Sequence, residues 1–511
     1  MAAFLEDVLR RLLVPDNAVI VQATRELQEA YKDPNIVEHL YNALCMSQVG
    51  QVRQYSAVLL RKKVLKTKVW KKLPMETRTI LKANILQRLA IEKEKPVLTA
   101  LGQLVATIAK NECQSSAQWP ELEQFLNITT HSKNSEECQL GFYMVSLVAS
   151  VAPEMFAPHL RPLFNLFGTC LQSASDQEVC FRVIKSMTAL VNSLGSDEVN
   201  CFQALIPVAM EVIKNLAEVD EDKATEAMEL FDELIGCEIA ILLPHIKTLV
   251  KLCIDVARNR KFGNLFRVRS MCLLSWLISI KKKTIIKHKL IPELLEILFP
   301  IMSEVSQDGE LEDDEDDVDE NNRSSQLPSA CAAQVIDVMA LHLPPEKLLP
   351  PLSQLIEKYL GSNNPFHKKA AYLAIAVVAE GCSETIRQKH MQTFLHIICQ
   401  GIRDPDHHVK NSALFALGQF ADYLQPDIAK YASEVLPMLF NYLSETAEHL
   451  KLNGRNPPSL SRTFYALETF CETLEQDLVP YLPSLMEQLF AFLDAPTHRA
   501  KELAVSAIGA A

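Results

Sequence analysis

Acidic side chains are gathered in two segments of this sequence, and both predict binding of a basic partner. In the first, 308–320, ten of the thirteen residues are acidic and none is basic. These carboxylates supply −10 of the formal net charge of −12, which leaves −2 for the rest of the chain. Such a block cannot bury its charges, so we expect a solvated loop that contacts a basic partner; a tolerated surface insertion is the alternative. The candidate contacts are Glu312, Asp313, Asp314, Glu315, Asp316 and Asp317.

The second acidic segment, 221–238, has helical periodicity. Four carboxylates follow one another at i, i+4, i+7 and i+11, which places them on one face of a helix, while the apolar residues point the other way. Most such stripes are simply solvated faces. A second helix of a stacked hairpin, however, lies on the usual binding side of a repeat protein, so we expect this stripe to contact a basic partner. Its members are Asp222, Glu226, Glu229 and Glu233.

Lysines and arginines cluster at 61–72 and 281–289. Clusters of this kind can mark nucleic-acid binding. Here the whole chain is acidic, and the clusters contain few interleaved aromatic residues. We therefore interpret them as helix-end and inter-helix lysines, and we predict no direct contact with nucleic acid.

Motifs of the common enzyme classes do not occur in the sequence. It contains no GxxxxGK[ST], GxGxxG, GxSxG or HExxH. The 13 cysteines are dispersed without a CxxC pair, which predicts free thiols in a reducing compartment rather than disulfides or a zinc site. We predict no catalytic residue, no metal and no cofactor. Because no apolar run approaches the ~20 residues that span a bilayer, we also predict no membrane insertion.

A pair of amphipathic helices recurs about every forty residues, and this period predicts an all-α fold, a HEAT-repeat α-solenoid of about twelve helical pairs. The clearest copy of the pattern is at 404–418, and a second is at 496–509. The predicted pairs are 2–13 with 16–31, 35–47 with 50–65, 74–92 with 95–112, 119–131 with 134–151, 153–173 with 176–194, 197–218 with 221–236, 239–259 with 264–281, 284–305 with 327–342, 345–361 with 364–381, 384–403 with 405–423, 427–445 with 457–474, and 477–494 with 496–511.

These pairs divide the chain into N-terminal repeats at 1–112, central repeats at 113–306, the acidic loop at 307–326 within the eighth pair, and further repeats at 327–511. The last residues, 504–511, are apolar and have no polar cap. Terminal repeats need a polar outer face, so we expect this chain to be the front part of a longer solenoid.

The stretch Val-Arg-Gln-Tyr-Ser-Ala-Val-Leu-Leu-Arg-Lys-Lys-Val at 52–64 resembles the N-terminal signature of importin-β-type nuclear transport receptors. An acidic loop within the eighth repeat is also a feature of that family. The resemblance to a member of this family is densest at 339–348, 411–420 and 499–509. The resemblance runs along the whole chain, which would be about the N-terminal half of such a receptor. Periodicity alone predicts only a HEAT scaffold.

The resemblance implies a nuclear import receptor that shuttles between cytoplasm and nucleus. Such a receptor binds basic cargo proteins, such as histones or ribosomal proteins, in the cytoplasm and releases them when Ran-GTP binds in the nucleus. Phe-Gly nucleoporins would dock between outer helices. The alternative is a HEAT scaffold that assembles other proteins without nucleotide control.

Within this family Ran-GTP binds the first few repeats, so the resemblance makes 1–112 the Ran-binding region. Helix 50–65 would contribute contacts, together with the acidic loop. The residues carried over are Arg53, Tyr55, Arg61 and Lys62. Arg53 could equally be a structural arginine of the repeat.

Overall fold

The computed structural model describes residues 2–173, 176–237, 241–305 and 327–511. Every regular element in these ranges is a helix, and they contain no strand, which confirms the predicted all-α HEAT-repeat fold. The chain divides into two compact units, Met1–His245 and Ile246–Ala511. The predicted loop at 307–326, with Glu312, Asp313, Asp314, Glu315, Asp316 and Asp317, lies outside the described residues.

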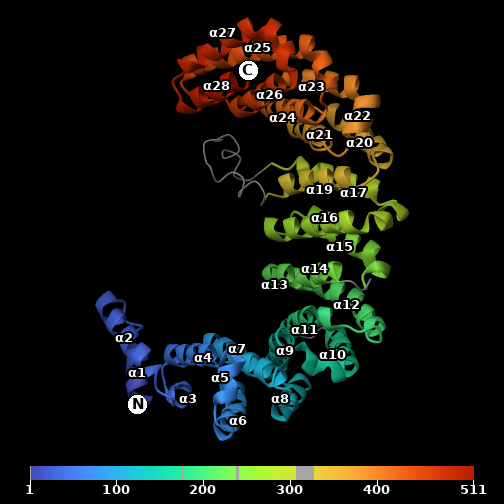
Figure 1. The fold of residues 1–511 in the computed structure, drawn as a ribbon. Coiled ribbons are helices and arrows are strands. Elements are labelled where there is room, and N and C mark those ends of the chain that lie inside the picture. Colours follow the sequence, from blue (N-terminus) through green and yellow to red (C-terminus); the bar gives the residue numbers. More distant parts are fainter. Residues whose placement is uncertain (1, 174–175, 238–240, 306–326) are drawn as a thin grey trace. The chain divides into compact units, whose positions relative to one another are not determined.

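Unit 1 consists of helical pairs joined by short turns (Figure 1). Its elements are α1 (Ala2–Arg11), α2 (Asn17–Ala30), α3 (Ile36–Met46), α4 (Gly50–Val64), α5 (Thr67–Lys72), α6 (Met75–Ile91), α7 (Lys95–Cys113), α8 (Pro120–Thr130), α9 (Ser135–Ala149), η1 (Pro153–His159), α10 (Leu160–Ser173), α11 (Gln177–Leu190), η2 (Val191–Ser193), α12 (Val199–Ala217), α13 (Glu221–Ala227), α14 (Glu229–Gly236) and η3 (Leu243–His245).

Unit 2 repeats the same plan. Its elements are α15 (Ile246–Arg258), α16 (Asn264–Lys287), α17 (Ile291–Met302), α19 (Pro328–His342), α20 (Pro345–Leu360), α21 (Pro365–Val377), α22 (Ser383–Lys389), α23 (Met391–Ile402), α24 (His407–Tyr423), η4 (Asp427–Tyr431), α25 (Ala432–Asn453), α26 (Leu460–Leu474), η5 (Glu475–Tyr481), α27 (Leu482–Leu493) and α28 (His498–Ala510).

Local sequence signals set the beginning of many second helices. Side chains of Asp16, Asp176, Asp220 and Asp406 each accept hydrogen bonds from backbone N–H groups of the following helix. These caps satisfy donors that have no partner inside the first turn. A proline in the first turn, such as Pro365 of α21, has no backbone N–H and so leaves one donor fewer to satisfy. The turn between the two helices of a pair is therefore fixed by a few residues.

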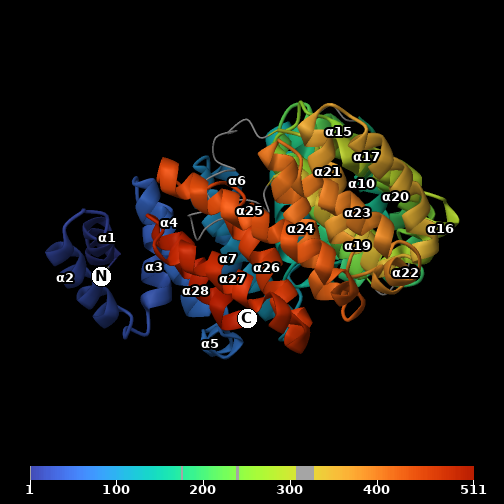
Figure 2. The same ribbon diagram turned by 90° about the horizontal axis from the view of Figure 1, so that it is seen from above.

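The second helices of successive pairs stack directly on one another within each unit. In unit 1 this layer is α4, α7, α9 and α11, and in unit 2 it is α16, α19, α21, α24, α26 and α28. Figures 1 and 2 both show α21 beside α24. Leu, Ile, Val, Phe and Ala fill the space between the layers. Each pair thus buries its apolar faces against its neighbours, as repeat proteins do.

Several helices differ from the prediction. The predicted helix 284–305 begins only at Ile291, because α16 continues through a kink at Lys281 to Lys287. The predicted helix 221–236 is interrupted at Met228. The short helix α5 was not predicted. The division at 112, 306 and 326 stays a prediction, and the described contacts divide the chain after His245.

In the part of the chain that the structure describes, no single helix has the length and apolar composition of a membrane span. One bent pair of helices, Ser135–Ala149 with Pro153–Ser173, meets these length and composition criteria when the two are taken together, with an angle of 116° between them.

Candidate partner-binding surfaces

Arg53 is a buried structural residue and does not face solvent. Only 7% of it is exposed. Its Nε and Nη2 atoms each lie 3.1 Å from a carboxylate oxygen of Glu92, and Nη2 is 2.8 Å from Glu94 Oε1. Its Nη1 donates to the carbonyl oxygen of Ser47 at 3.2 Å. The guanidinium fork is therefore occupied by the turn after α3 and the turn between α6 and α7, which favours the structural alternative that the sequence left open.

The same ion pair recurs in unit 2. Arg267, also the fourth residue of a second helix, donates to Glu304 at 2.7 Å. Lys368 of α21 donates to Asp404 at 2.8 Å. In each case the acidic residue follows the first helix of the next pair. These cations therefore join neighbouring repeats.

The three consecutive cations at the end of α4 point in different directions. Arg61 hydrogen-bonds to Gln103 on α7. Lys63 donates to the carbonyl oxygen of Tyr31 at 2.9 Å. Lys62 is exposed, and so is Tyr55, seven residues earlier on the same helical face. Of the four residues carried over from the family, Tyr55 and Lys62 are available to a partner, Arg61 is partly engaged, and Arg53 is buried.

The predicted acidic stripe forms a continuous exposed surface in unit 1. Asp222 and Glu226 of α13 and Glu229 and Glu233 of α14 are all exposed, despite the interruption at Met228. We call these four residues the acidic ridge. Its opposite face is buried, as the periodicity predicted.

One cation and one amide of the preceding elements engage part of this charge. Lys185 of α11 lies 2.9 Å from Glu226 and 2.7 Å from Glu229. Partial burial disfavours the charged form of Lys185, but these two hydrogen bonds prevail and raise its pKa. Asn192 donates to Glu233 at 3.2 Å. Much of the ridge is therefore already engaged within the fold.

A second row of carboxylates crosses the second-helix layer of unit 2. Each of four successive second helices contributes one acidic residue, in its C-terminal half or just after its end. We call them the carboxylate row: Asp337 of α19, Glu380 just after α21, Asp422 of α24 and Glu468 of α26. Sequence reasoning missed this row.

Gly381 brings two members of the row together. A Cβ atom at this position would lie 2.3 Å from the carbonyl carbon of Ala340, far closer than any real contact. Glycine therefore allows the turn after α21 to pack directly on the α19 backbone. Glu380, the preceding residue, consequently lies close enough to Asp337 for its charge to act on that carboxyl.

Asp337 is a perturbed carboxyl within the row. Burial raises its pKa to about 6, and the negative charge of Glu380 adds to the rise. Both causes disfavour the ionised form, so a cation placed here would relieve both. A perturbed carboxyl of this kind indicates a candidate functional site when it lies on an accessible surface.

Two tyrosines fill the space between the other carboxylates. Burial and the charges of Glu380 and Asp422 raise the pKa of Tyr423, whose hydroxyl hydrogen-bonds to Glu380. Tyr465 packs on Gly418, where a Cβ would lie 2.2 Å from the ring. Beyond it, Glu468 Oε1 is buried and has no hydrogen-bond partner among the described residues. An unpaired buried carboxylate oxygen is costly unless a donor reaches it.

The signal for this row is present in the sequence, but it is weak. Its members are spaced by 43, 42 and 46 residues, close to the repeat length. Many other acidic residues recur at similar spacing. Which of these acidic residues share a surface depends on how each helix is rotated about its own axis.

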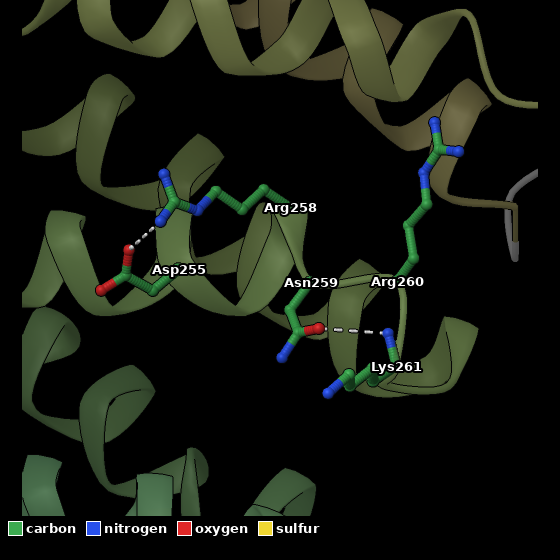
Figure 3. A pocket seen from close by; sticks show the side chains of 5 residues that line it. All are labelled: Asp255, Arg258, Asn259, Arg260 and Lys261. Atoms are coloured by element: carbon green, nitrogen blue, oxygen red, sulfur yellow. Dashed lines mark hydrogen bonds and ion pairs between the residues drawn. The ribbon is translucent and has the colours of Figure 1, made fainter.

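A separate hollow at the end of α15 is lined by cations, and Figure 3 shows how they lie. Arg258 pairs with Asp255 at 3.7 Å, and the Lys261 backbone donates to Asn259 at 3.1 Å. Arg260 donates to Glu304 at 3.0 Å, so it belongs to the same inter-repeat contact as Arg267. No group of three or more metal-ligating side chains occurs within the described ranges.

Family models match three parts of the chain. The importin-beta N-terminal domain matches residues 23–90, "IPO5-like, TPR repeats" matches 93–252, and the HEAT-like repeat matches 365–420. Importin-4 of Mus musculus and importin-4 of Homo sapiens are each 38% identical to this chain, over 445 and 446 residues respectively. Each alignment covers 86% of this chain and 41% of the relative. The chain therefore spans about two-fifths of the length of these relatives.

Solved structures share the fold. A Kap121p mutant superposes with a TM-score of 0.85 at 21% identity, covering 100% of this chain and 48% of that one. Kap121p bound to RanGTP gives 0.82 at 23% identity, covering 99% and 48%. These identities establish the fold alone. With the family models and the importin-4 relatives, they confirm the resemblance that the sequence indicated.

Proposed function

The chain belongs to the importin-β family of nuclear transport receptors, and we propose from this premise that it serves nuclear import, binding a basic protein cargo in the cytoplasm and releasing it in the nucleus when Ran-GTP binds. It would accordingly shuttle between the two compartments. Histones and ribosomal proteins are the basic cargoes that we expect.

The carboxylate row carries this proposal. Its charge is unbalanced, since Asp337 and Glu380 repel each other. Lysine or arginine side chains of an extended segment would supply the missing cations. Successive second helices lie ~8–10 Å apart, so one segment can cross several carboxylates. The acidic ridge is a second candidate surface, but Lys185 already engages two of its four members.

Solved relatives support a site of this kind. Kap121p has been crystallised bound to Pho4p and bound to Nup53p. The mutant described above replaces two aspartates and one glutamate of Kap121p with lysine. By analogy, we propose that the basic cargo segment of this chain binds carboxylates of unit 2, and that nucleoporins are further partners.

For Ran-GTP we propose the exposed face of α4, with Tyr55 and Lys62 as the accessible contacts and Arg61 at its edge. Arg53 is buried beneath this face, and its ion pair with Glu92 holds α4 in position. The acidic loop 307–326 stays a proposed contact. The structure of Kap121p bound to RanGTP supports Ran as a partner for a chain of this family.

Release of cargo requires coupling between the two sites. Typical couplings are ~1–3 kcal/mol, whereas a shift from 1:99 to 99:1 needs about 5.5 kcal/mol. Conformational coupling alone is therefore too small. We expect direct competition for acidic surface to contribute as well.

The test is release of a fluorescent lysine-rich peptide from the chain by Ran. Ran-GTP should displace the peptide and Ran-GDP should not. Equal displacement by both forms would instead favour a HEAT scaffold without nucleotide control. Tyr55→Ala with Lys62→Ala should weaken the Ran-GTP effect without changing peptide affinity.

A further inference from the structure

We propose that Trp276 of α16 forms one end of the carboxylate row, where its indole face takes the side chain of a lysine or arginine from the bound basic segment. This assignment rests on the proposed function and names a specificity residue within it.

Trp276 is unusual among the three tryptophans of the chain. Trp70 and Trp119 are 0% and 1% exposed, and the Trp70 indole donates to Glu112 at 2.7 Å. Trp276 is 59% exposed on the solvent face of a second helix. A large aromatic side chain in such a position loses much of the favourable burial available to it in a core. Its exposure is therefore better explained by a partner than by folding.

The helix register places Trp276 level with Asp337. The thiol of Cys331 on α19 lies 3.9 Å from the carbonyl oxygen of Val268 and hydrogen-bonds with Cys272, so it faces the stretch 268–272 of α16. Both helices are second helices and run in the same direction. Six residues farther along each helix, Asp337 is level along the helix axis with the stretch 274–278, whose centre is Trp276.

One turn farther, the same register brings two more exposed apolar residues to one level. Ile280 of α16 is 46% exposed, and Leu341 of α19 is 45% exposed. Ile280 lies four residues after Trp276, and Leu341 lies four residues after Asp337. The four residues therefore occupy neighbouring positions on two adjacent helices. The surface thus joins an apolar strip to the first carboxylate of the row.

Lysine and arginine suit this combination better than other side chains. Their aliphatic stems can cover an apolar ring while their charged heads reach a carboxylate. A cation above an indole face also interacts with the ring quadrupole, and tryptophan is the strongest aromatic partner for it. Charge complementarity with the row therefore selects a basic segment as the occupant.

Three variants test the assignment with a tryptophan-free peptide of alternating lysine and glycine. Trp276→Leu keeps an apolar side chain without the ring, and Trp276→Phe keeps a ring. Leu265→Ala is the matched control, because Leu265 is 65% exposed on the same helix, eleven residues before Trp276. We expect Trp276→Leu to weaken binding about three- to tenfold. Trp276→Phe should weaken it less, and Leu265→Ala should not change it.

Fluorescence gives an independent readout. Because the other two tryptophans are buried, acrylamide should quench mainly Trp276, and the peptide should protect it. If Trp276→Leu binds as tightly as the unchanged chain while Asp337→Asn with Glu380→Gln weakens binding, the role of Trp276 is wrong and the proposed function stands. If the unchanged chain does not bind the peptide at all, both proposals are wrong.

Discussion

Replacing Arg53 with methionine tests whether this residue holds the fold together or binds a partner. The substitution keeps an apolar stem and removes four hydrogen bonds, two of them to Glu92. Breaking a buried ion pair by removing one partner costs about 3–5 kcal/mol. Glu92 keeps the Arg88 contact at 2.7 Å and two backbone donors. We therefore expect the local stability to fall by less than this range suggests, by about 2–3 kcal/mol.

Hydrogen exchange of α4 and α7 measures this loss locally, which matters because a long repeat array need not unfold in one step. A loss of about 2–3 kcal/mol corresponds to roughly 30- to 150-fold faster exchange at one decade per 1.4 kcal/mol. Tyr55→Ala and Lys62→Ala, on the exposed face of the same helix, should leave exchange unchanged. Adding Glu92→Gln to the Arg53 variant should cost less than the sum of the two single changes.

The same ion pair predicts an acid-sensitive unit 1. Burial opposes ionisation of Glu92, but hydrogen bonds from Arg53, the backbone and Arg88 prevail and lower its pKa. Its contribution to stability is therefore present above the unfolded pKa and is lost as pH falls through the folded one.

Unchanged hydrogen exchange in Arg53→Met, combined with loss of Ran-GTP binding, would refute the structural role of Arg53 and favour a role in binding.

Three further predictions concern the acidic surfaces. Burial raises the pKa of Asp337 to about 6, so the folded chain holds this proton more tightly than the unfolded chain and loses stability as pH rises from about 4 to 6. Asp337→Asn should raise the thermal midpoint of the chain at pH 7.5 and leave it unchanged at pH 4. Gly381→Ala should lower the free energy of unfolding by about 1–3 kcal/mol, and the midpoint with it, because a Cβ there would lie 2.3 Å from the α19 backbone. Gly509→Ala, with nothing within 4 Å of the new Cβ, should not lower the midpoint. Lys185→Met should strengthen peptide binding at low salt, measured by anisotropy, and the gain should vanish at high salt.

Much of the helical architecture could be predicted from the sequence, because apolar periodicity and capping residues act locally. The exceptions are places where local rules do not decide. Lys281 occupies a kink inside a long apolar helix, and the pattern cannot distinguish a kink from an end. The exposed face of the acidic ridge was predicted correctly because it depends only on spacing along neighbouring short helices.

The binding surfaces were harder to predict, because they depend on contacts between repeats. Nothing near Arg53 in the sequence identifies Glu92, thirty-nine residues away, as its partner. The carboxylate row depends on the register between successive second helices, which Gly381 sets by its close approach to α19. Lys185 likewise offsets the charge of Glu226 and Glu229, which lie forty-one and forty-four residues later in the sequence.

The most direct measurement compares two neutralised variants in one peptide-binding titration. One variant carries Asp337→Asn, Glu380→Gln and Asp422→Asn; the other carries Asp222→Asn, Glu226→Gln and Glu229→Gln, an equal loss of charge on the acidic ridge. The account predicts that the first variant loses most of its affinity for the lysine–glycine peptide and that the second keeps nearly all of it. Equal affinities, or a greater loss in the ridge variant, would contradict the carboxylate row as the cargo site.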